Sequence, residues 1–241
     1  MTDFGYREVA PEEKTRLVDE VFTSVAGRYD LMNDLMSVGI HRLWKRHFVA
    51  TAGIRAGEHL LDLAGGTGDI ARLAHAHGAR VAVADINRAM LTNGRARLDR
   101  EGVVEGLEWL QVNAEALPFA ANSFDHVTIV FGLRNVTHRE QALAEMHRVL
   151  RPGGRVHIME FSKVGLPGLA TLYDTWSFQV LPRLGERIAG DGESYQYLAE
   201  SIRRFPDQPT LAGMLGEAGF ERVTWHNLSG GICAIHRGAK V

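Results

Sequence analysis

The sequence predicts an α/β fold, namely a seven-stranded, mostly parallel, doubly wound sheet with a C-terminal antiparallel hairpin strand and a helical insertion. Three observations predict it. Apolar strands alternate with helical stretches from residue 59 onward, which is typical of a parallel sheet. A glycine-rich turn follows the first of these strands. The last two strands flank a tight turn, Ser229-Gly230-Gly231, so one of them must run antiparallel to the others.

Each element follows from the local pattern. Residues 1–55 lack strand character and carry apolar side chains at helical intervals, so we expect a helical flank or lid there. Thr137 and Glu140 form a capping-box pattern at the start of one helix, and Gly219 is placed to end another. The predicted strands are 59–64, 81–86, 107–113, 124–131, 155–161, 222–228 and 232–237, and the predicted helices are 69–77, up to 98, 138–150 and 210–218.

The alternation of strands and helices stops after residue 161. The stretch that follows carries Leu169, Leu172, Trp176 and Val180 at helical spacing, which predicts inserted helices. We therefore expect a single domain over 1–241, made of a helical flank (1–55), a cofactor-binding core (56–162), a helical insertion (163–208) and a last helix with the terminal hairpin (209–241).

Composition excludes several classes of protein. A net charge of -2 gives no basic field for nucleic acid, and the single cysteine, Cys233, excludes an internal disulfide. The 11 histidines form no zinc motif, so we expect no metal. No apolar run is long enough to span a membrane, and the N-terminus is too acidic for a signal peptide. We expect a cytoplasmic protein that contacts a membrane peripherally at most.

The glycine-rich turn predicts a nucleoside site. Gly65, Gly66 and Gly68 allow positive φ and a close approach of the backbone to a ligand, and the helix that starts at Asp69 presents free N–H groups. Asp85 ends the next strand, where a carboxylate is suited to accept hydrogen bonds from both ribose hydroxyls. The turn by itself fits NAD and S-adenosylmethionine equally, because Gly66-x-Gly68-x-x-Ala71 also matches a relaxed dinucleotide fingerprint. The terminal hairpin favours a methyltransferase.

Two sets of residues carry a family resemblance. Asn113-Ala114-Glu115-Ala116-Leu117-Pro118-Phe119 resembles the adenine-binding segment of S-adenosylmethionine-dependent methyltransferases, although Asn113 also suits a residue that caps its own turn. Tyr29-Asp30-Leu31-Met32-Asn33 with Ser37, His41 and Trp44, and Arg148 to Gly154 leading to Glu160-Phe161-Ser162, resemble the signatures of the ubiquinone and menaquinone biosynthesis C-methyltransferases. Gly132 to Val136 and Tyr197 to Ile202 add to this resemblance.

The resemblance implies a class I methyltransferase fold, S-adenosyl-L-methionine as methyl donor, and a polyprenylated quinol as substrate. The product is then menaquinol, the 3-methyl derivative of 2-methoxy-6-polyprenyl-1,4-benzoquinol, or both. The resemblance assigns Asn113 and Ala114 to the adenine, and together with the glycine turn the expected cofactor residues are Gly65, Gly66, Thr67, Asp85, Asn113 and Ala114. Two alternatives stay open, an NAD(P)-dependent oxidoreductase and a non-catalytic cofactor-binding scaffold of a quinone-synthesis complex. A homodimer or association with such a complex is compatible with the sequence.

Methylation of a ring carbon needs a quinol hydroxyl to lose its proton, so we expect a cation and a proton relay near the ring. Arg134 follows the fourth strand and is expected to stabilise the oxyanion; its alternative is a surface salt bridge to Glu140 or Glu145. Asn135 is expected to orient the hydroxyl or a water, unless it caps the next helix beside Thr137.

The remaining expectations concern proton transfer and the substrate's tail. Asp69 is expected as base or relay; its alternative is a favourable contact with a helix N-terminus. Tyr29 either covers the cofactor or packs within its helix. The tail requires an apolar groove, and the insertion offers one, rimmed by Arg203 and Arg204. Its candidate lining is Leu169, Tyr173, Trp176, Val180, Leu181, Tyr195 and Tyr197, and the alternative is that most of these side chains pack the inserted helices on the sheet.

Overall fold

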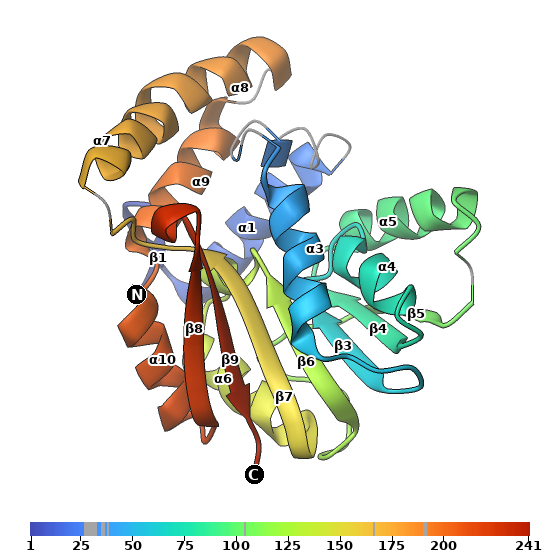
Figure 1. Ribbon diagram of the computed structural model, residues 1–241. Coiled ribbons are helices and arrows are strands. Elements are labelled where there is room, and N and C mark those ends of the chain that lie inside the picture. Colours follow the sequence, from blue (N-terminus) through green and yellow to red (C-terminus); the bar gives the residue numbers. More distant parts are fainter. Residues whose placement is uncertain (27–32, 35–36, 38, 104, 166, 190–191) are drawn as a thin grey trace.

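A seven-stranded sheet forms the centre of the molecule (Figure 1). The computed structural model describes residues 1–26, 33–34, 37, 39–103, 105–165, 167–189 and 192–241. The strand order is β5-β4-β3-β6-β7-β9-β8, with β9 antiparallel to both β7 and β8 and the other pairs parallel. The predicted fold class and terminal hairpin are therefore confirmed. The strands are β3 His59–Leu63, β4 Arg80–Asp85, β5 Leu107–Gln111, β6 Phe124–Val130, β7 Leu150–Phe161, β8 Glu221–Leu228 and β9 Cys233–Ala239.

Helices cover both faces of this sheet. One apolar core joins a face of the sheet to α3 (His41–Ala52), α4 (Asp69–His75) and α5 (Arg88–Arg100). The other core joins the opposite face to α6 (Arg139–Val149) and α10 (Gln208–Glu217). The strands alternate between the two cores, since Val81 and Val83 belong to the first and Ala82 and Ala84 to the second. Burial on both faces explains why the central strands β3, β4 and β6 are mostly apolar and do not alternate between apolar and polar residues.

The N-terminal segment differs from the prediction. Before α1 (Pro11–Val25) it forms a small antiparallel hairpin, β1 (Thr2–Phe4) and β2 (Arg7–Val9). Phe4 stacks on Tyr197 at a centroid distance of 4.2 Å, and the Tyr6 N–H donates to Glu200. Three-residue strands are too short to show an alternating pattern, and these contacts with a distant helix support them. The expectation that residues 1–55 have no strand is wrong for this reason.

Two local predictions in the core are also corrected. Helix α6 starts at Arg139 with His138 as N-cap and no side-chain cap, so the predicted capping box is wrong. The Thr137 N–H instead donates to Glu115 from the loop after β5. Strand β7 starts at Leu150 and not at Arg155 as predicted, because the glycine segment forms a bulge between the Phe124–Leu150 and His126–Arg155 pairs.

The inserted helices stand above the carboxyl edge of the sheet, in orange in Figure 1. They are α7 (Pro167–Thr175), a π-helical turn (Trp176–Val180), α8 (Leu181–Ala189) and α9 (Gly192–Arg204). Helix α9 anchors the insertion, because Tyr195, Leu198 and Ile202 pack into the first core. In the part of the chain that the structure describes, no helix is long and apolar enough to cross a membrane.

Candidate functional site

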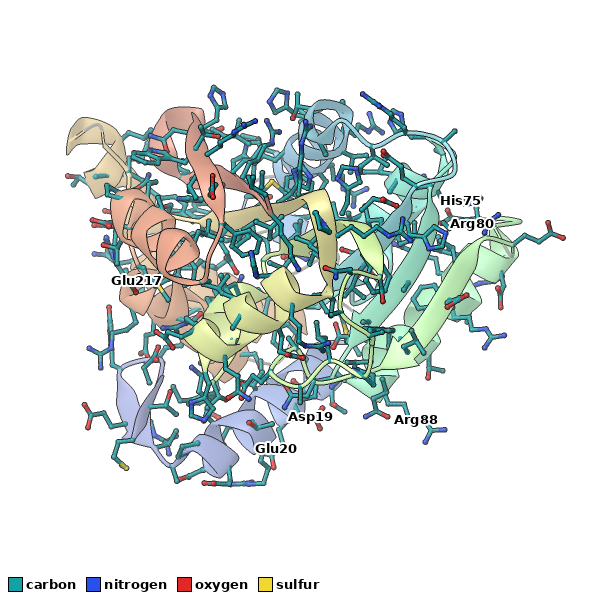
Figure 2. The ribbon with its side chains drawn as sticks, turned by 90° about the horizontal axis from the view of Figure 1, so that it is seen from below. Asp19, Glu20, His75, Arg80, Arg88 and Glu217 are labelled. Carbon is teal, nitrogen blue, oxygen red and sulfur yellow. The ribbon has the colours of Figure 1, made fainter. Side chains whose placement is uncertain are left out.

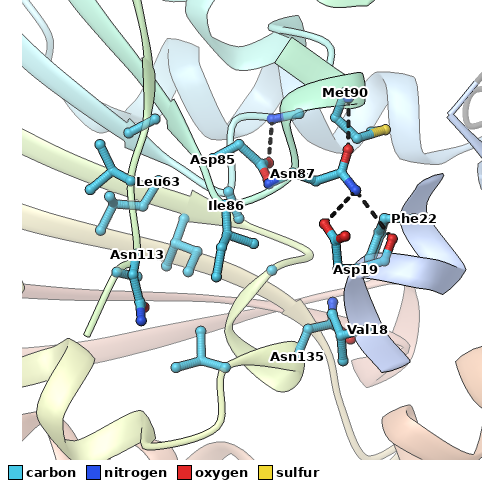
Figure 3. Close-up of a pocket in the computed structure, with 18 of the residues that line it drawn as sticks. Val18, Asp19, Phe22, Leu63, Asp85, Ile86, Asn87, Met90, Asn113 and Asn135 are labelled. Atoms are coloured by element: carbon cyan, nitrogen blue, oxygen red, sulfur yellow. Dashed lines mark hydrogen bonds between the residues drawn. The ribbon is translucent and has the colours of Figure 1, made fainter. Parts of the chain in front are cut away.

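A cleft opens at the carboxyl ends of β3, β4 and β6 and is closed on one side by α1 (Figure 3). Ligands bind at this edge in doubly wound sheets, where parallel strands end and helices begin. Five of the residues predicted from sequence line it: Gly66, Asp85, Asn113, Ala114 and Asn135. The topology thus brings together residues that lie up to about seventy positions apart in the chain.

Asp85 lies deep in the cleft at the end of β4. Its Oδ2 accepts the Gly66 N–H at 2.9 Å and its Oδ1 accepts the Asn87 N–H at 2.8 Å (Figure 3). Burial raises the pKa of Asp85 to about 6, although these N–H donors favour the charged form. A carboxylate has about four acceptor positions, so two remain for the hydroxyls of a ribose.

Asn113 and Ala114 follow β5 and line the cleft. The Asn113 Oδ1 accepts the N–H of Glu115 at 2.9 Å, so the alternative in which Asn113 caps its own turn is present in the structure. This bond uses the carbonyl end of the side chain and leaves the NH2 group as a donor. Turn capping and a contact with a purine edge are therefore compatible.

The glycine turn between β3 and α4 bends as predicted at two of its three glycines. Gly66 and Gly68 have φ of 54° and 81°, and the third positive φ is taken by Ala64 at 48° in place of Gly65. Gly65 is needed for space, because a Cβ there would lie 2.7 Å from the Val83 side chain.

A smaller pocket adjoins the cleft and shares Ala64 and Gly66 with it. Gly65, Thr67 and Asp69, three further predicted residues, line this second pocket. Sequence reasoning missed two others, Lys45 of α3 and Asp62 of β3. The signal for Asp62 was a single acid within an otherwise apolar strand, two residues before the turn.

Asp62 is 1 % exposed, and its Oδ1 accepts a hydrogen bond from Thr128 at 2.8 Å. Its Oδ2 is buried and makes no hydrogen bond of ordinary geometry with the described residues, although the Ala71 N–H lies close enough to the carboxylate to favour its charged form. Burial raises the pKa of Asp62 to about 7. A buried acceptor without a partner is costly, so this oxygen is suited to a cationic ligand group.

Asp69 does not line the large cleft. Its Oδ2 accepts from Lys45 Nζ at 2.7 Å and its Oδ1 from Arg97 Nη2 at 2.5 Å. Burial by itself would raise its pKa, but the two cations outweigh burial and hold the pKa of Asp69 well below its usual range. A carboxylate held ionised in this way is a weak proton acceptor, and its place in the first turn of α4 matches the predicted alternative.

Arg134 is 2 % exposed and lies outside the residues that line the cleft. Its Nη1 donates to the Phe131 carbonyl and to Glu160, with an ion-pair distance of 3.0 Å to Glu160 Oε2. The alternative of a surface salt bridge to Glu140 or Glu145 is therefore wrong. The guanidinium also lies 5.9 Å from the centre of the Phe161 ring. Within the described residues its Nε has no hydrogen-bond partner.

Asn135 belongs to a short 3-10 turn, Leu133–Asn135, and lines the cleft across from Asp85 (Figure 3). Its Oδ1 accepts a hydrogen bond from the Tyr197 hydroxyl at 2.9 Å. The alternative in which Asn135 caps α6 is wrong, since His138 occupies that position.

The model of the ubiE/COQ5 methyltransferase family matches residues 8–240. The ubiquinone/menaquinone biosynthesis C-methyltransferases UbiE of Yersinia pestis and Yersinia pseudotuberculosis are 57% identical over 243 residues, covering 99% of this chain and 96% of theirs. The chain belongs to the ubiE/COQ5 methyltransferase family.

Solved structures show the same fold. A SAM-dependent methyltransferase from Thermotoga maritima superposes with a TM-score of 0.65 at 18% identity, covering 93% of this chain and 100% of that one. The Haemonchus contortus phosphoethanolamine N-methyltransferase 2 in complex with S-adenosyl-L-methionine gives a TM-score of 0.60 at 15% identity, covering 82% and 52%.

Family membership confirms that this ubiE/COQ5 protein is an S-adenosylmethionine-dependent C-methyltransferase of ubiquinone/menaquinone biosynthesis with a class I fold. The oxidoreductase alternative gains no support. The family is one of methyltransferases, so the hypothesis of a non-catalytic scaffold is also dropped.

Helix α1 contributes a wall of the cleft that the sequence did not reveal. Thr15, Val18, Asp19 and Phe22 line it, and the Asn87 amide donates to the Asp19 carboxylate at 2.9 Å. Figure 2, seen from below, shows α1 with Asp19 and Glu20 on the side of the molecule away from α3. Apolar residues at helical intervals predicted a lid but not which face it presents. Tyr29 lies outside the described residues, so its two alternatives stay predictions.

Proposed function

We propose that this chain methylates a ring carbon of a demethylated polyprenyl quinol, either demethylmenaquinol, 2-methoxy-6-polyprenyl-1,4-benzoquinol, or both. The observation that carries the proposal is the cleft itself, in which four of the predicted cofactor residues, Gly66, Asp85, Asn113 and Ala114, share one cavity with Asn135. The names of the 57% identical relatives supply the pathway.

The residues present fit S-adenosylmethionine. Asp85 is placed to hold the ribose, and Asn113 and Ala114 to contact the adenine. In the adjoining pocket, the Asp62 Oδ2 without a partner suits the ammonium of the methionine end, and Lys45 suits its carboxylate. The sulfonium supplies an already activated methyl group, so positioning contributes much of the catalysis.

Asn135 and Arg134 act on the quinol in this proposal. Asn135 lines the cleft, and its amide orients the ring hydroxyl or a water. Arg134 does not line the cleft, so its guanidinium acts on the phenolate through its field and through the adjacent Asn135, while its ion pair with Glu160 holds it in place. Asp69 acts as an anchor for Lys45 and Arg97 rather than as the base, because its pKa is depressed.

A groove under the insertion suits the prenyl tail. It is separate from the cleft, and its apolar lining includes Tyr173, Phe178 and Ile202. Arg203 at its rim pairs with Asp174 and lies over the Phe178 ring. Tyr195 and Tyr197 do not line this groove. They are buried, in agreement with the alternative that the aromatic side chains pack the inserted helices on the sheet.

We further propose that the protein lies in the cytoplasm and contacts the membrane surface peripherally. Leu172 on α7 is 68% exposed, and a tail held in the bilayer must enter near these helices. Flotation with anionic vesicles should carry the protein, and Leu172→Glu should abolish it. Val241→Glu at the exposed C-terminus, on the opposite side of the molecule (Figure 1), is the matched control. A wild-type protein that stays free of the vesicles would contradict the contact.

The decisive experiment offers labelled methyl donor and reduced demethylated quinols to the purified protein and identifies the product by mass spectrometry. Asn135→Ala should lower turnover by about a hundredfold without changing the affinity for the donor. Asp85→Ala should do the reverse and weaken donor binding in calorimetry. Glu217→Ala on α10 (Figure 2), exposed and remote from the cleft, is the control. No labelled quinol with any of these substrates would refute the proposal.

A further inference from the structure

Tyr197 is a buried phenol that nothing in the chemistry above uses. It lies on α9 in the insertion, sixty-two residues from Asn135 in sequence, yet its hydroxyl donates to the Asn135 Oδ1 at 2.9 Å. It is 7% exposed and does not line the cleft. A side chain that reaches a cleft residue without touching the cleft is placed to act through that residue.

We propose that Tyr197 is a positioning residue that fixes the orientation of the Asn135 amide. An asparagine amide has an acceptor end and a donor end, and the two orientations present opposite hydrogen-bonding groups. With its oxygen held by Tyr197, Asn135 has its NH2 group left as the donor that it can offer to the cleft it lines. This inference rests on the proposed role of Asn135 and deepens it, because a donor at this place selects an ionised quinol oxygen.

The tyrosine itself is held firmly as a donor. Burial raises the pKa of Tyr197 above its ordinary value, so the hydroxyl keeps its proton at neutral pH and stays a donor. Phe4 stacks on its ring with an interplanar angle of 18°. Aromatic pairs of this geometry contribute about 0.5–1.5 kcal/mol beyond burial.

The N-terminal hairpin holds Phe4 in place. The Tyr6 N–H donates to Glu200 Oε2 at 3.0 Å, one turn beyond Tyr197 on α9. Asp3 forms an ion pair of 3.1 Å with Arg139, at the start of α6. The first residues of the chain therefore brace α9 against the loop that carries Asn135. This gives the hairpin a part in the geometry of the site, although it lies outside the cleft.

The test is a double-mutant cycle with the whole chain. Tyr197→Phe removes the hydroxyl and keeps the ring, and it should lower kcat about tenfold, the effect of one hydrogen bond, with the KM for the methyl donor within about twofold. On an Asn135→Ala background the same change should have no further effect. Tyr6→Phe, a hydroxyl deletion at a half-exposed ring of the N-terminal hairpin, is the matched control.

The outcomes separate the two proposals. If Asn135→Ala turns over like the wild type, the role of Asn135 fails and this inference with it. Two results overturn only the positioning role. In the first, Asn135→Ala loses turnover while Tyr197→Phe keeps the wild-type kcat. In the second, the loss of kcat caused by Tyr197→Phe adds in full to the loss caused by Asn135→Ala. If the Tm of Tyr197→Phe is more than about 5 °C below that of the wild type, Phe4→Ala takes its place in the cycle. Phe4→Ala should lower kcat by a smaller factor, and it should have no further effect on kcat in the Asn135→Ala background.

Discussion

Asp62→Asn should stabilise the protein at pH 8 while weakening its affinity for S-adenosylmethionine. The wild-type carboxyl is buried, with Oδ2 unpartnered among the described residues, and burial raises its pKa from 3.8 to about 7. Because the folded-state pKa lies above the unfolded one, the stability that Asp62 contributes is fully present below pH 4. It is lost as the pH rises through 7, and asparagine, which does not ionise, avoids this loss.

The magnitude follows from the difference between the two pKa values. Relative to the unfolded chain, in which the carboxyl ionises near pH 3.8, the fold loses about 1.7 kcal/mol by pH 5 and about 4 kcal/mol by pH 8, at about 1.36 kcal/mol for each pH unit between the two pKa values. An asparagine keeps the bond from Thr128 but buries an unpaired NH2 group, which costs about 2 kcal/mol. The variant should therefore equal the wild type at pH 5 and exceed it by about 2 kcal/mol at pH 8.

The assay is thermal unfolding of both proteins between pH 5 and pH 8, without ligand. For a chain of this size the gain corresponds to roughly 5 °C in Tm at pH 8. Asp125→Asn is the control of opposite sign, because His59 and Arg151 hold the pKa of Asp125 low against the effect of burial. A Tm difference for Asp62→Asn that does not change with pH would refute the reasoning. Donor affinity that stays at the wild-type level in calorimetry would remove Asp62 from the methionine site.

Three further predictions follow from packing. A Cβ at Gly94 would lie 2.7 Å from the Thr67 Cα, so Gly94→Ala should displace the glycine turn and weaken donor binding in calorimetry at least tenfold. The control is Gly213→Ala, where the added methyl group has open space and should stabilise α10 by about 0.4–1 kcal/mol in denaturant unfolding. Arg134→Ala should lose about 3–5 kcal/mol of stability because it leaves Glu160 buried and unpaired, and adding Glu160→Gln should recover part of this loss. The Cys233 thiol, buried and with its pKa raised, should react with a thiol reagent only after unfolding; rapid labelling of the folded protein would contradict its burial.

The order of strands and helices in the core was predictable from sequence because their patterns are local. Alternating buried strands and the terminal hairpin needed only hydrophobic runs and glycines, and Gly219 marks the end of α10 with a φ of 95° as predicted. The strands of the N-terminal hairpin were missed, since three-residue strands carry no periodic signal and Phe4 depends on a contact with Tyr197.

The sequence by itself determined the fold class, the family and the cleft residues near the glycine turn. Gly66, Asp85 and Asn113 each end or follow a strand, and parallel strands bring such positions to one edge of the sheet. Only the tertiary structure decided the charge environment of each carboxylate. Asp62 and Asp69 lie seven residues apart, yet burial raises the pKa of the first while Lys45 and Arg97 lower that of the second. Those partners come from other helices, and no local pattern encodes which side chains meet across the fold.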